Sequence, residues 1–271
     1  MTVEEQARDA QDSAALSWMA RLGFAMYGVV YVVVGILAVQ LALGRSSGKV
    51  SGEGALHELA HQPFGTALLV AAAAGLGAVT AWEVCEAIGG HTADDGARRW
   101  VARAGSVARA AVFAVLAWLA VRLILGEDCS SGGTEGHTAR VMDLPFGPVI
   151  VTAAGLLVFA FGAHSAHEGL SDRWKKDLER GAGAGATGTL LTVTARAGHV
   201  ARGVAFGMIG ALLVWAAVTH DARRSAGLDQ ALRELRDTPA GPALLLAIAV
   251  GLGSYGVFNT AKAVVLRTRR P

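Results

Sequence analysis

Four long runs of the chain carry no charged side chain. Each run is about as long as the ~20 residues that a helix needs to cross a ~30 Å hydrocarbon layer. The pattern therefore predicts four transmembrane helices, over Leu22–Leu43, Gln62–Trp82, Leu144–Ala163 and Thr238–Ala261.

Two further apolar runs are shorter and follow or precede basic residues. Ala110–Val121 lies between Arg109 and Arg122, and Gly203–Thr219 follows Arg202. An arginine at a helix end can extend its aliphatic stem to the interface and keep its guanidinium group in water. With that extension both runs can span, so the sequence predicts an all-α membrane protein with six transmembrane helices.

A seven-residue phrase recurs at three of these runs. It reads RAGSVAR at residues 103–109, RAGHVAR at 196–202 and, in weaker form, RLGFAMY at 21–27. We interpret it as the start of each odd-numbered helix. In this interpretation an arginine lies at the membrane interface, and a glycine follows that lets helices approach closely.

The even-numbered helices also open alike, with PFG at residues 63–65 and 145–147 and PAG at 239–241. Proline suits the first turn of a helix, where its missing N–H is not needed. The phrases GALHELAHQ and QALRELRDT precede the first and third of these starts and predict short amphipathic surface helices. The corresponding segment of the second repeat, CSSGGTEGHTAR, is rich in glycine, and we expect it to be irregular.

These recurrences divide the chain into three two-helix repeats, at residues 1–95, 96–185 and 186–271. The first begins with a polar segment, the second ends in a charged linker, and the third ends in a basic tail. Because each repeat holds an even number of spans, all three have the same orientation. Parallel repeats are related by an axis along the membrane normal, so we expect a pseudo-threefold arrangement.

The RxG and PFG helix starts, together with helix endings such as AWEVCEA at residues 81–87, resemble the bacterial family catalogued as domain of unknown function 1206. The resemblance covers nearly the whole chain and implies tandem two-helix membrane repeats. It implies no assigned activity, so no catalytic residue carries over from it. Lys262 departs from the pattern, because the family has an acidic residue there.

The composition agrees with a membrane protein, since 53% of the residues are hydrophobic and 17% are charged, against about a quarter in soluble domains. Of the 24 lysines and arginines, sixteen fall on the side that holds both termini and eight on the other. Basic residues favour the cytoplasmic side. We therefore expect a multi-pass protein of the bacterial plasma membrane with both termini cytoplasmic. The net charge of +2 reflects this topology and gives no reason to expect nucleic acid as a partner.

Polar residues gather at the ends of the even-numbered helices. Counting from the helix-opening prolines aligns Glu83 with Ser165 and Asn259, and Glu86 with Glu168 and Lys262. Ionisable residues inside a membrane are candidates for function, whereas at a helix end they also serve as ordinary interfacial charges. The candidate polar cluster, with a structural or a transport role, consists of Glu83, Glu86, Glu168, Lys262, Arg21, Arg103 and Arg196.

Within this cluster we expect ion pairs that join the two helices of one repeat. Glu86 should pair with Arg21, and Glu168 with Arg103, because each pair would lie at the same end of one hairpin. Lys262 would face another arginine, Arg196, in its own repeat, so we expect it to reach an acid of a neighbouring repeat.

Three histidines, His164, His167 and His199, raise the alternative of a metal or haem site. The first two share a helix face and stand beside Glu168. No HExxH or related motif is present, so we expect hydrogen-bonding histidines, no metal and no cofactor. GAGATG at 183–188 matches the dinucleotide fingerprint GxGxxG but lacks the strand that must precede it, and we interpret it as a linker.

Two functions remain open on the sequence. We see no Ser–His–Asp arrangement, no catalytic carboxylate pair in a supporting motif and no Walker lysine, so we do not expect an enzyme. The small-residue seams favour a non-enzymatic structural or accessory module of the cell envelope. The alternative is a small transporter or channel that uses a polar site between the repeats. The partners we expect are membrane lipids, contacted by segments such as SDRWKKDLER at 171–180, and a membrane protein.

Overall fold

The computed structural model describes residues 14–45, 48–89, 97–126, 134–171, 185–221 and 228–265, and the regular structure of these residues is entirely helical. Six helices are long and apolar enough to cross a membrane, which confirms the six predicted spans. They are α2 (Ala14–Ala42), α4 (Gly65–Gly89), α5 (Ala97–Ile124), α7 (Gly147–Leu170), α8 (Gly185–Thr219) and α10 (Gly241–Val265). Three short helices join them in pairs, α3 (Gly52–Ala60), α6 (Thr134–Met142) and α9 (Leu228–Arg236).

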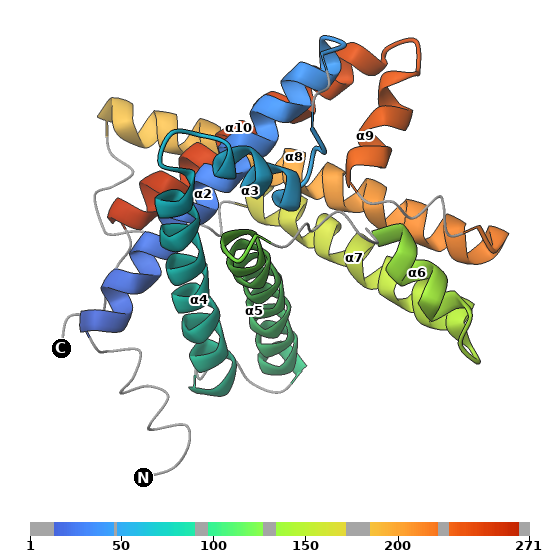
Figure 1. Ribbon diagram of the computed structural model, residues 1–271, viewed down its shortest axis with the longest axis horizontal. Helices are drawn as coiled ribbons and strands as arrows, with labels where there is room; N and C mark the ends of the chain where they lie inside the picture. Colours follow the sequence, from blue (N-terminus) through green and yellow to red (C-terminus); the bar gives the residue numbers. More distant parts are fainter. Residues whose placement is uncertain are drawn as a thin grey trace.

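The closest helix packing joins one repeat to the next. α4 packs along α5, α7 along α8, and α10 returns to pack along α2; Figure 1 shows these three antiparallel pairs running in three directions. The sequence predicted hairpins within each repeat as the packing units. Instead, each tight pair combines the even-numbered helix of one repeat with the odd-numbered helix of the following one, and the last pair joins the two ends of the chain.

Glycines at equivalent positions make two of these pairs alike. A Cβ atom built on Gly162 of α7 would lie 2.7 Å from the carbonyl oxygen of Gly203 of α8. One built on Gly28 of α2 would lie 2.6 Å from the carbonyl oxygen of Gly256 of α10. Both contacts leave no room for a side chain, so the backbones meet directly, as in small-residue seams of membrane helices. Two of the three pairs thus repeat the same contact.

Packing within a repeat is present twice and missing once. In the first repeat α2 meets α4 at Gly23 and Gly75, and in the third α8 meets α10 at Gly198 and Gly251. In the second repeat Leu157 replaces the glycine at the equivalent position of α7, and its side chain is 72% exposed. Among the described residues α5 and α7 share no extended packing, so the helices follow the order α5, α4, α2, α10, α8, α7 with an opening between the first and the last.

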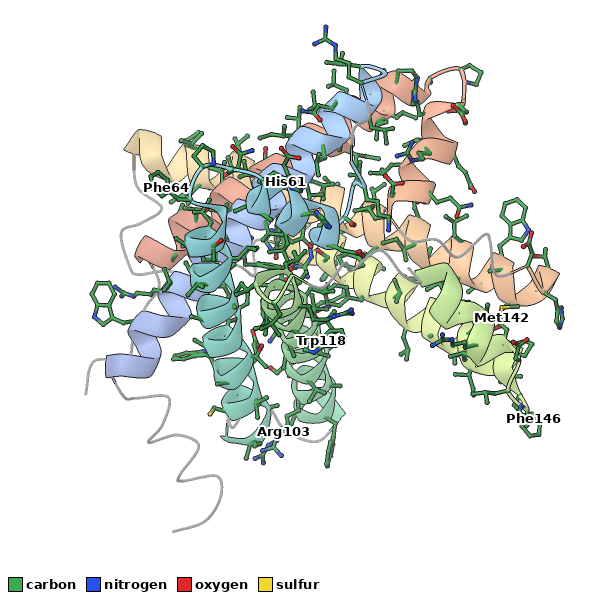
Figure 2. All side chains as sticks on the ribbon, in the orientation of Figure 1. His61, Phe64, Arg103, Trp118, Met142 and Phe146 are labelled. Atoms are coloured by element: carbon green, nitrogen blue, oxygen red, sulfur yellow. The ribbon has the colours of Figure 1, made fainter. Side chains whose placement is uncertain are left out.

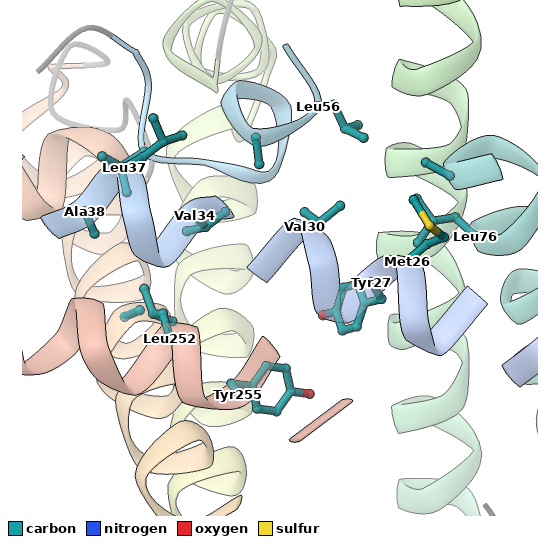
Figure 3. Packing of buried hydrophobic residues seen from close by; sticks show 14 of the residues in the cluster. Met26, Tyr27, Val30, Val34, Leu37, Ala38, Leu56, Leu76, Leu252 and Tyr255 are labelled. Carbon is teal, nitrogen blue, oxygen red and sulfur yellow. The ribbon is translucent and has the colours of Figure 1, made fainter. Parts of the chain in front are cut away.

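The apolar core centres on α2 and its neighbours α4 and α10 (Figure 3). The short helices α3 and α9 cover one end of it with Leu56 and Leu232, which are fully buried. The backbone N–H of Val50 donates to Asp229 Oδ1 at 2.8 Å and thereby ties α9 to the segment before α3. We call this end of the bundle the short-helix end, and the opposite end, where the three arginine phrases lie, the heptad end.

Three local predictions were wrong. The long helices begin before the seven-residue phrases, since α5 starts at Ala97 and α8 at Gly185, so these phrases lie inside the helices and GAGATG is partly helical. The segment CSSGGTEGHTAR is helical from Thr134 onwards, as part of α6. The opening prolines stand two residues before their helices.

The residue between each opening proline and the helix explains that offset. Phe64 and Phe146 adopt left-handed backbone angles, with φ of 66° and 65°, and their exposed rings lie on the surface (Figure 2). The chain turns so sharply here that a Cβ atom on Gly65 or Gly147 would collide with carbonyl oxygens of the preceding short helix. The glycine of the PFG motif is therefore required by the turn, and the helix begins at it.

Candidate polar site between the repeats

The last position of the seven-residue phrase points into the centre of the bundle in all three repeats. Tyr27, Arg109 and Arg202 occupy it, and the two arginines lie inside the membrane-spanning stretches of α5 and α8. Each arginine stands six residues, or ~9 Å, further along its helix than the first arginine of its phrase. They are therefore not interfacial helix ends, as the sequence suggested, but ionisable groups within the span.

Arg109 forms an ion pair with Glu83 of α4. The distance from Arg109 Nε to Glu83 Oε1 is 2.9 Å, and Arg109 Nη2 donates to Ser106 Oγ at 3.0 Å. Glu83 and Ser106 are buried, whereas 37% of the Arg109 side chain is exposed. The second carboxylate oxygen of Glu83 is buried and has no hydrogen-bond donor among the described residues. This ion pair leaves almost no net charge between helices α4 and α5 at this depth.

Arg202 lies in a different environment. Its guanidinium carbon is 4.9 Å from the ring centroid of Phe161, 5.4 Å from Phe206 and 4.8 Å from Tyr255, and Nη1 donates to the Tyr255 hydroxyl. Only 7% of Arg202 is exposed. No carboxylate of the described residues lies within 4.0 Å of it, and its buried Nε has no hydrogen-bond acceptor there. Aromatic faces stabilise a cation by ~0.5–2 kcal/mol each, but they do not neutralise it.

The repeat explains why Arg202 lacks a carboxylate. Counting from the helix-opening prolines, the position of Glu83 is held by Ser165 in α7 and by Asn259 in α10. Ser165 is 2% exposed, and its hydroxyl donates to the His199 carbonyl oxygen at 3.2 Å. The amide of Asn259 donates to the Tyr255 carbonyl oxygen at 2.8 Å. The second and third repeats keep a polar residue at this position and lose its charge.

Glu168 and His199 lie close to the two arginines. Their side chains are 4.0 Å apart, and 34% of the Glu168 side chain is exposed against 6% of His199. His199 Nδ1 is 2.8 Å from the Ala195 carbonyl oxygen, which fixes the ring. Electrostatic interactions join Glu168 to both Arg109 and Arg202 and join the two arginines to each other. These four residues and Glu83 form the central polar site.

Aromatic rings from five helices pack around this site. Tyr27 is 4.7 Å from Phe113 and 6.3 Å from Tyr255, between ring centroids, and Figure 3 shows Tyr27 and Tyr255 on their facing helices. Tyr255 also packs edge-on against Tyr31 at 4.8 Å, and the equivalent contact between α7 and α8 is that of Phe161 with Phe206 at 5.1 Å. The centre of the bundle is thus filled by rings and charges from all three repeats.

Of the residues predicted to form the polar cluster, Glu83 and Glu168 lie in the central polar site. Arg103 lies at the heptad end of α5 (Figure 2), where Nη2 donates to the Ile88 carbonyl oxygen at 2.8 Å. Arg21 lies 5.5 Å from the Trp18 ring centroid, Glu86 is half-buried, and Arg196 is exposed.

The predicted pairs of Glu86 with Arg21 and of Glu168 with Arg103 stay predictions. The side chain of Lys262 and the segment 172–184 lie outside the described residues, and with them the expected inter-repeat pair and the lipid contacts of Trp174, Lys175 and Lys176.

The three candidate metal-binding histidines differ in burial. His164 and His167 are exposed on α7, whereas His199 is buried in α8. In the described part of the chain no group of three or more histidine, cysteine or acidic side chains is arranged to hold a metal ion.

Sequence reasoning missed Arg109, Arg202 and Tyr255 as site residues. The missed signal is the spacing within the phrase RAGxVAR. Its two arginines are six residues, or ~9 Å, apart along one helix, so the second lies deeper in the span than the first.

Comparisons with known proteins agree with the repeats. The family model described as Domain of Unknown Function (DUF1206) matches three times, over residues 22–90, 104–172 and 197–265. A protein of Bacillus subtilis (strain 168), "Uncharacterized protein YxxB", is 33% identical over 249 residues, which cover 90% of this chain and 89% of the relative. No solved structure matches the chain.

Proposed function

Because the chain belongs to the family described as Domain of Unknown Function (DUF1206), whose description names no activity, we propose its function from the geometry: a non-enzymatic accessory module of the bacterial cell envelope. The observation that carries this proposal is the filled centre of the bundle. Arg202 with its three rings, and Tyr27 with Phe113 and Tyr255, join helices of all three repeats. Their contacts are those of a packed hub, which would keep three helix pairs at fixed angles to one another.

The test of this proposal is a deletion strain with complementation. We expect deletion to sensitise cells to detergent and osmotic stress, and the wild-type gene to restore tolerance. A variant that disrupts the seam of α7 and α8, Gly203→Leu, should fail to restore it, whereas Gly207→Leu, whose Cβ atom would meet nothing within 4 Å, should restore it. Normal tolerance in the deletion strain would contradict the proposal.

A second candidate function is a small transporter. The observation that favours it is the set of ionisable residues inside the spans, Glu83, Arg109 and Arg202, between parallel repeats. Charges within a membrane are costly and usually mark a site or a pathway. Reconstituted vesicles that exchange a labelled anion faster than empty vesicles would support transport, and exchange at the rate of empty vesicles would exclude it for the anions tested.

We place the chain in the plasma membrane with both termini cytoplasmic, from the excess of basic residues at the heptad end. The two native cysteines provide the test, because Cys85 is near the heptad end of α4 and Cys129 lies in the sequence between α5 and α6. On protoplasts with an intact membrane, a membrane-impermeant maleimide should label Cys129. It should label Cys85 only after the membrane is permeabilised. The opposite order of labelling would reverse the topology.

A further inference from the structure

We propose that Arg202 is the main ligand of a phosphate-type oxyanion that binds in the central polar site, between the second and third repeats. The binding site goes beyond both functions proposed above, since it concerns what the polar centre holds and not whether a solute crosses the membrane. Three observations, on charge, geometry and access, lead to it, and a fourth point concerns the source of the anion.

The first observation is the difference between the two arginines of the repeated phrase. Arg109 has a carboxylate partner, Glu83, at 2.9 Å. Arg202 stands at the equivalent position and is more deeply buried, and Ser165 of α7 occupies the repeat position that Glu83 occupies in α4. A buried cation without a counter-ion is strongly unfavourable, so the protein gains stability if an anion from outside replaces the missing carboxylate.

The second observation is the geometry of the Arg202 guanidinium group. Three aromatic rings pack around it, those of Phe161, Phe206 and Tyr255. Its Nη1 donates to the Tyr255 hydroxyl. Neither Nε nor Nη2 donates to a described residue, and Nε is buried. The edge that carries Nε and Nη2 is the edge through which arginine forms two parallel hydrogen bonds to an oxyanion. Among the described residues no acceptor takes a hydrogen bond from this edge of Arg202.

The third observation is a second cation with partial exposure beside the first. Arg109 lies in the electrostatic field of Arg202, and 37% of its side chain is exposed. Glu168, with 34% of its side chain exposed, interacts with both arginines. An anion would enter from the side where α5 and α7 do not pack together, would gain the attraction of two arginines, and would compete with Glu168 for them.

The fourth point concerns the source of the anion. A phosphate group reaches this site either as a soluble ion or as the headgroup of an anionic lipid that lies between α5 and α7. The same two arginines would hold both, so the chemistry is common to the two sources. Phosphate and phosphatidylglycerol are therefore separate arms of the test.

The experiment uses the purified full chain in a neutral detergent. Thermal unfolding is followed by tryptophan fluorescence during titration with sodium phosphate at constant ionic strength, and in parallel with phosphatidylglycerol or, as a control, phosphatidylcholine in mixed micelles. Native mass spectrometry counts the bound anions. We expect a saturable rise in unfolding temperature with one bound anion per chain. A response to phosphatidylglycerol alone identifies a lipid headgroup, and a response to phosphate identifies a soluble ligand.

Four variants locate the site. Arg202→Gln should weaken binding at least tenfold. Ser165→Glu and the shorter Ser165→Asp supply the missing carboxylate while keeping Arg202, so they should raise the unfolding temperature without anion and abolish its further rise. Glu168→Gln removes the competing charge and should tighten binding severalfold.

The matched control acts on the first repeat. Glu83→Ser removes the carboxylate partner of Arg109 and leaves a serine at that position, as Ser165 does in the second repeat, so the number of bound anions should rise from one to two.

The proposal is overturned if neither phosphate nor phosphatidylglycerol raises the unfolding temperature of the native chain. It is also overturned if Arg202→Gln binds as tightly as the native chain. Should Arg202→Gln fail to fold, unchanged binding by the Ser165 variants is the contradicting result. A Glu83→Ser chain that still holds one anion would refute the role of the missing carboxylate.

Discussion

The helix pairs α4–α5 and α7–α8 are built from equivalent residues, yet different forces hold them together. In α4–α5 an ion pair, Glu83 with Arg109, joins the two helices. In α7–α8 the arginine remains as Arg202, the acid has become Ser165, and glycines such as Gly162 and Gly203 bring the backbones into contact. A repeat can therefore keep its helix packing while one copy exchanges a charge–charge contact for close backbone contact, which releases a cation for another use.

The comparison predicts its largest effect at the glycine seam of α7–α8. In Gly203→Leu the new side chain would meet the Gly162 carbonyl oxygen and Ala166 at under 3 Å and would push the helices apart. We expect a loss of about 3 kcal/mol in the free energy of unfolding, at the upper end for overpacked sites. The measurement is denaturant or thermal unfolding in detergent.

Gly207→Leu is the matched control for that substitution. It makes the same chemical change one turn further along α8, where nothing lies within 4 Å of the added Cβ atom, and it should be nearly neutral. Equal losses in the two variants would mean that glycine content alone, and not the contact with Gly162, decides the stability of α8.

The next effect concerns the ion pair of α4–α5. Glu83→Gln removes the negative charge opposite Arg109, and we expect a loss of about 2 kcal/mol, below the ~3–5 kcal/mol of a fully buried pair because part of Arg109 is exposed. The control is Glu53→Gln, whose carboxylate is 4.0 Å from Lys49 on the surface and which should cost less than about 0.5 kcal/mol. Stability unchanged by Glu83→Gln would remove the distinction drawn between the two pairs.

These two effects show what sequence reasoning reached and what it did not. Uncharged runs and recurring phrases predicted six spans and three repeats, because helix length and the repeat depend only on residues that are close in the sequence. The pairing of α4 with α5 was not predicted, because both faces of such a helix are apolar and periodicity does not tell a partner from lipid. At the opening between α5 and α7 the glycine of the other repeats is replaced by Leu157, and this replacement is informative only when the neighbouring helix is known.

The site was predicted only in part for a similar reason. Glu83 and Glu168 were recognised as charges near helix ends, but Arg109 and Arg202 were assigned to the interface because each directly precedes an uncharged run. Helices α5 and α8 begin six or more residues before the seven-residue phrases. Both arginines therefore lie within the span. Ser165 could be recognised as the replacement of an arginine's acidic partner only after Arg109 was found beside Glu83.

The next prediction compares the two arginines when each is replaced by methionine. Arg202→Met, measured without added anion, replaces a cation among rings by an apolar side chain of similar length, and we expect a change within about 1 kcal/mol of the native stability. Arg109→Met leaves the buried carboxylate of Glu83 without its partner and should cost about 2 kcal/mol. If Arg202→Met were the more damaging of the two, Arg202 would carry more of the fold than its contacts indicate.

The smallest expected effect is the coupling energy of Glu168 with its neighbour, which shows whether that neighbour is His199 or Arg103. The sequence predicted Arg103 of the same repeat, whereas the structure places His199 of the next repeat 4.0 Å from Glu168 and gives Arg103 a hydrogen bond to the Ile88 carbonyl oxygen. Two double-mutant cycles, Glu168→Gln with His199→Gln and Glu168→Gln with Arg103→Gln, measure each coupling as the departure from additivity. Because Glu168 is partly exposed, we expect a coupling of about 0.5 kcal/mol with His199 and additivity with Arg103. A larger coupling with Arg103 would restore the hairpin pair inside the second repeat, and it would mean that α5 and α7 approach each other at the heptad end, which would narrow the route to the two arginines.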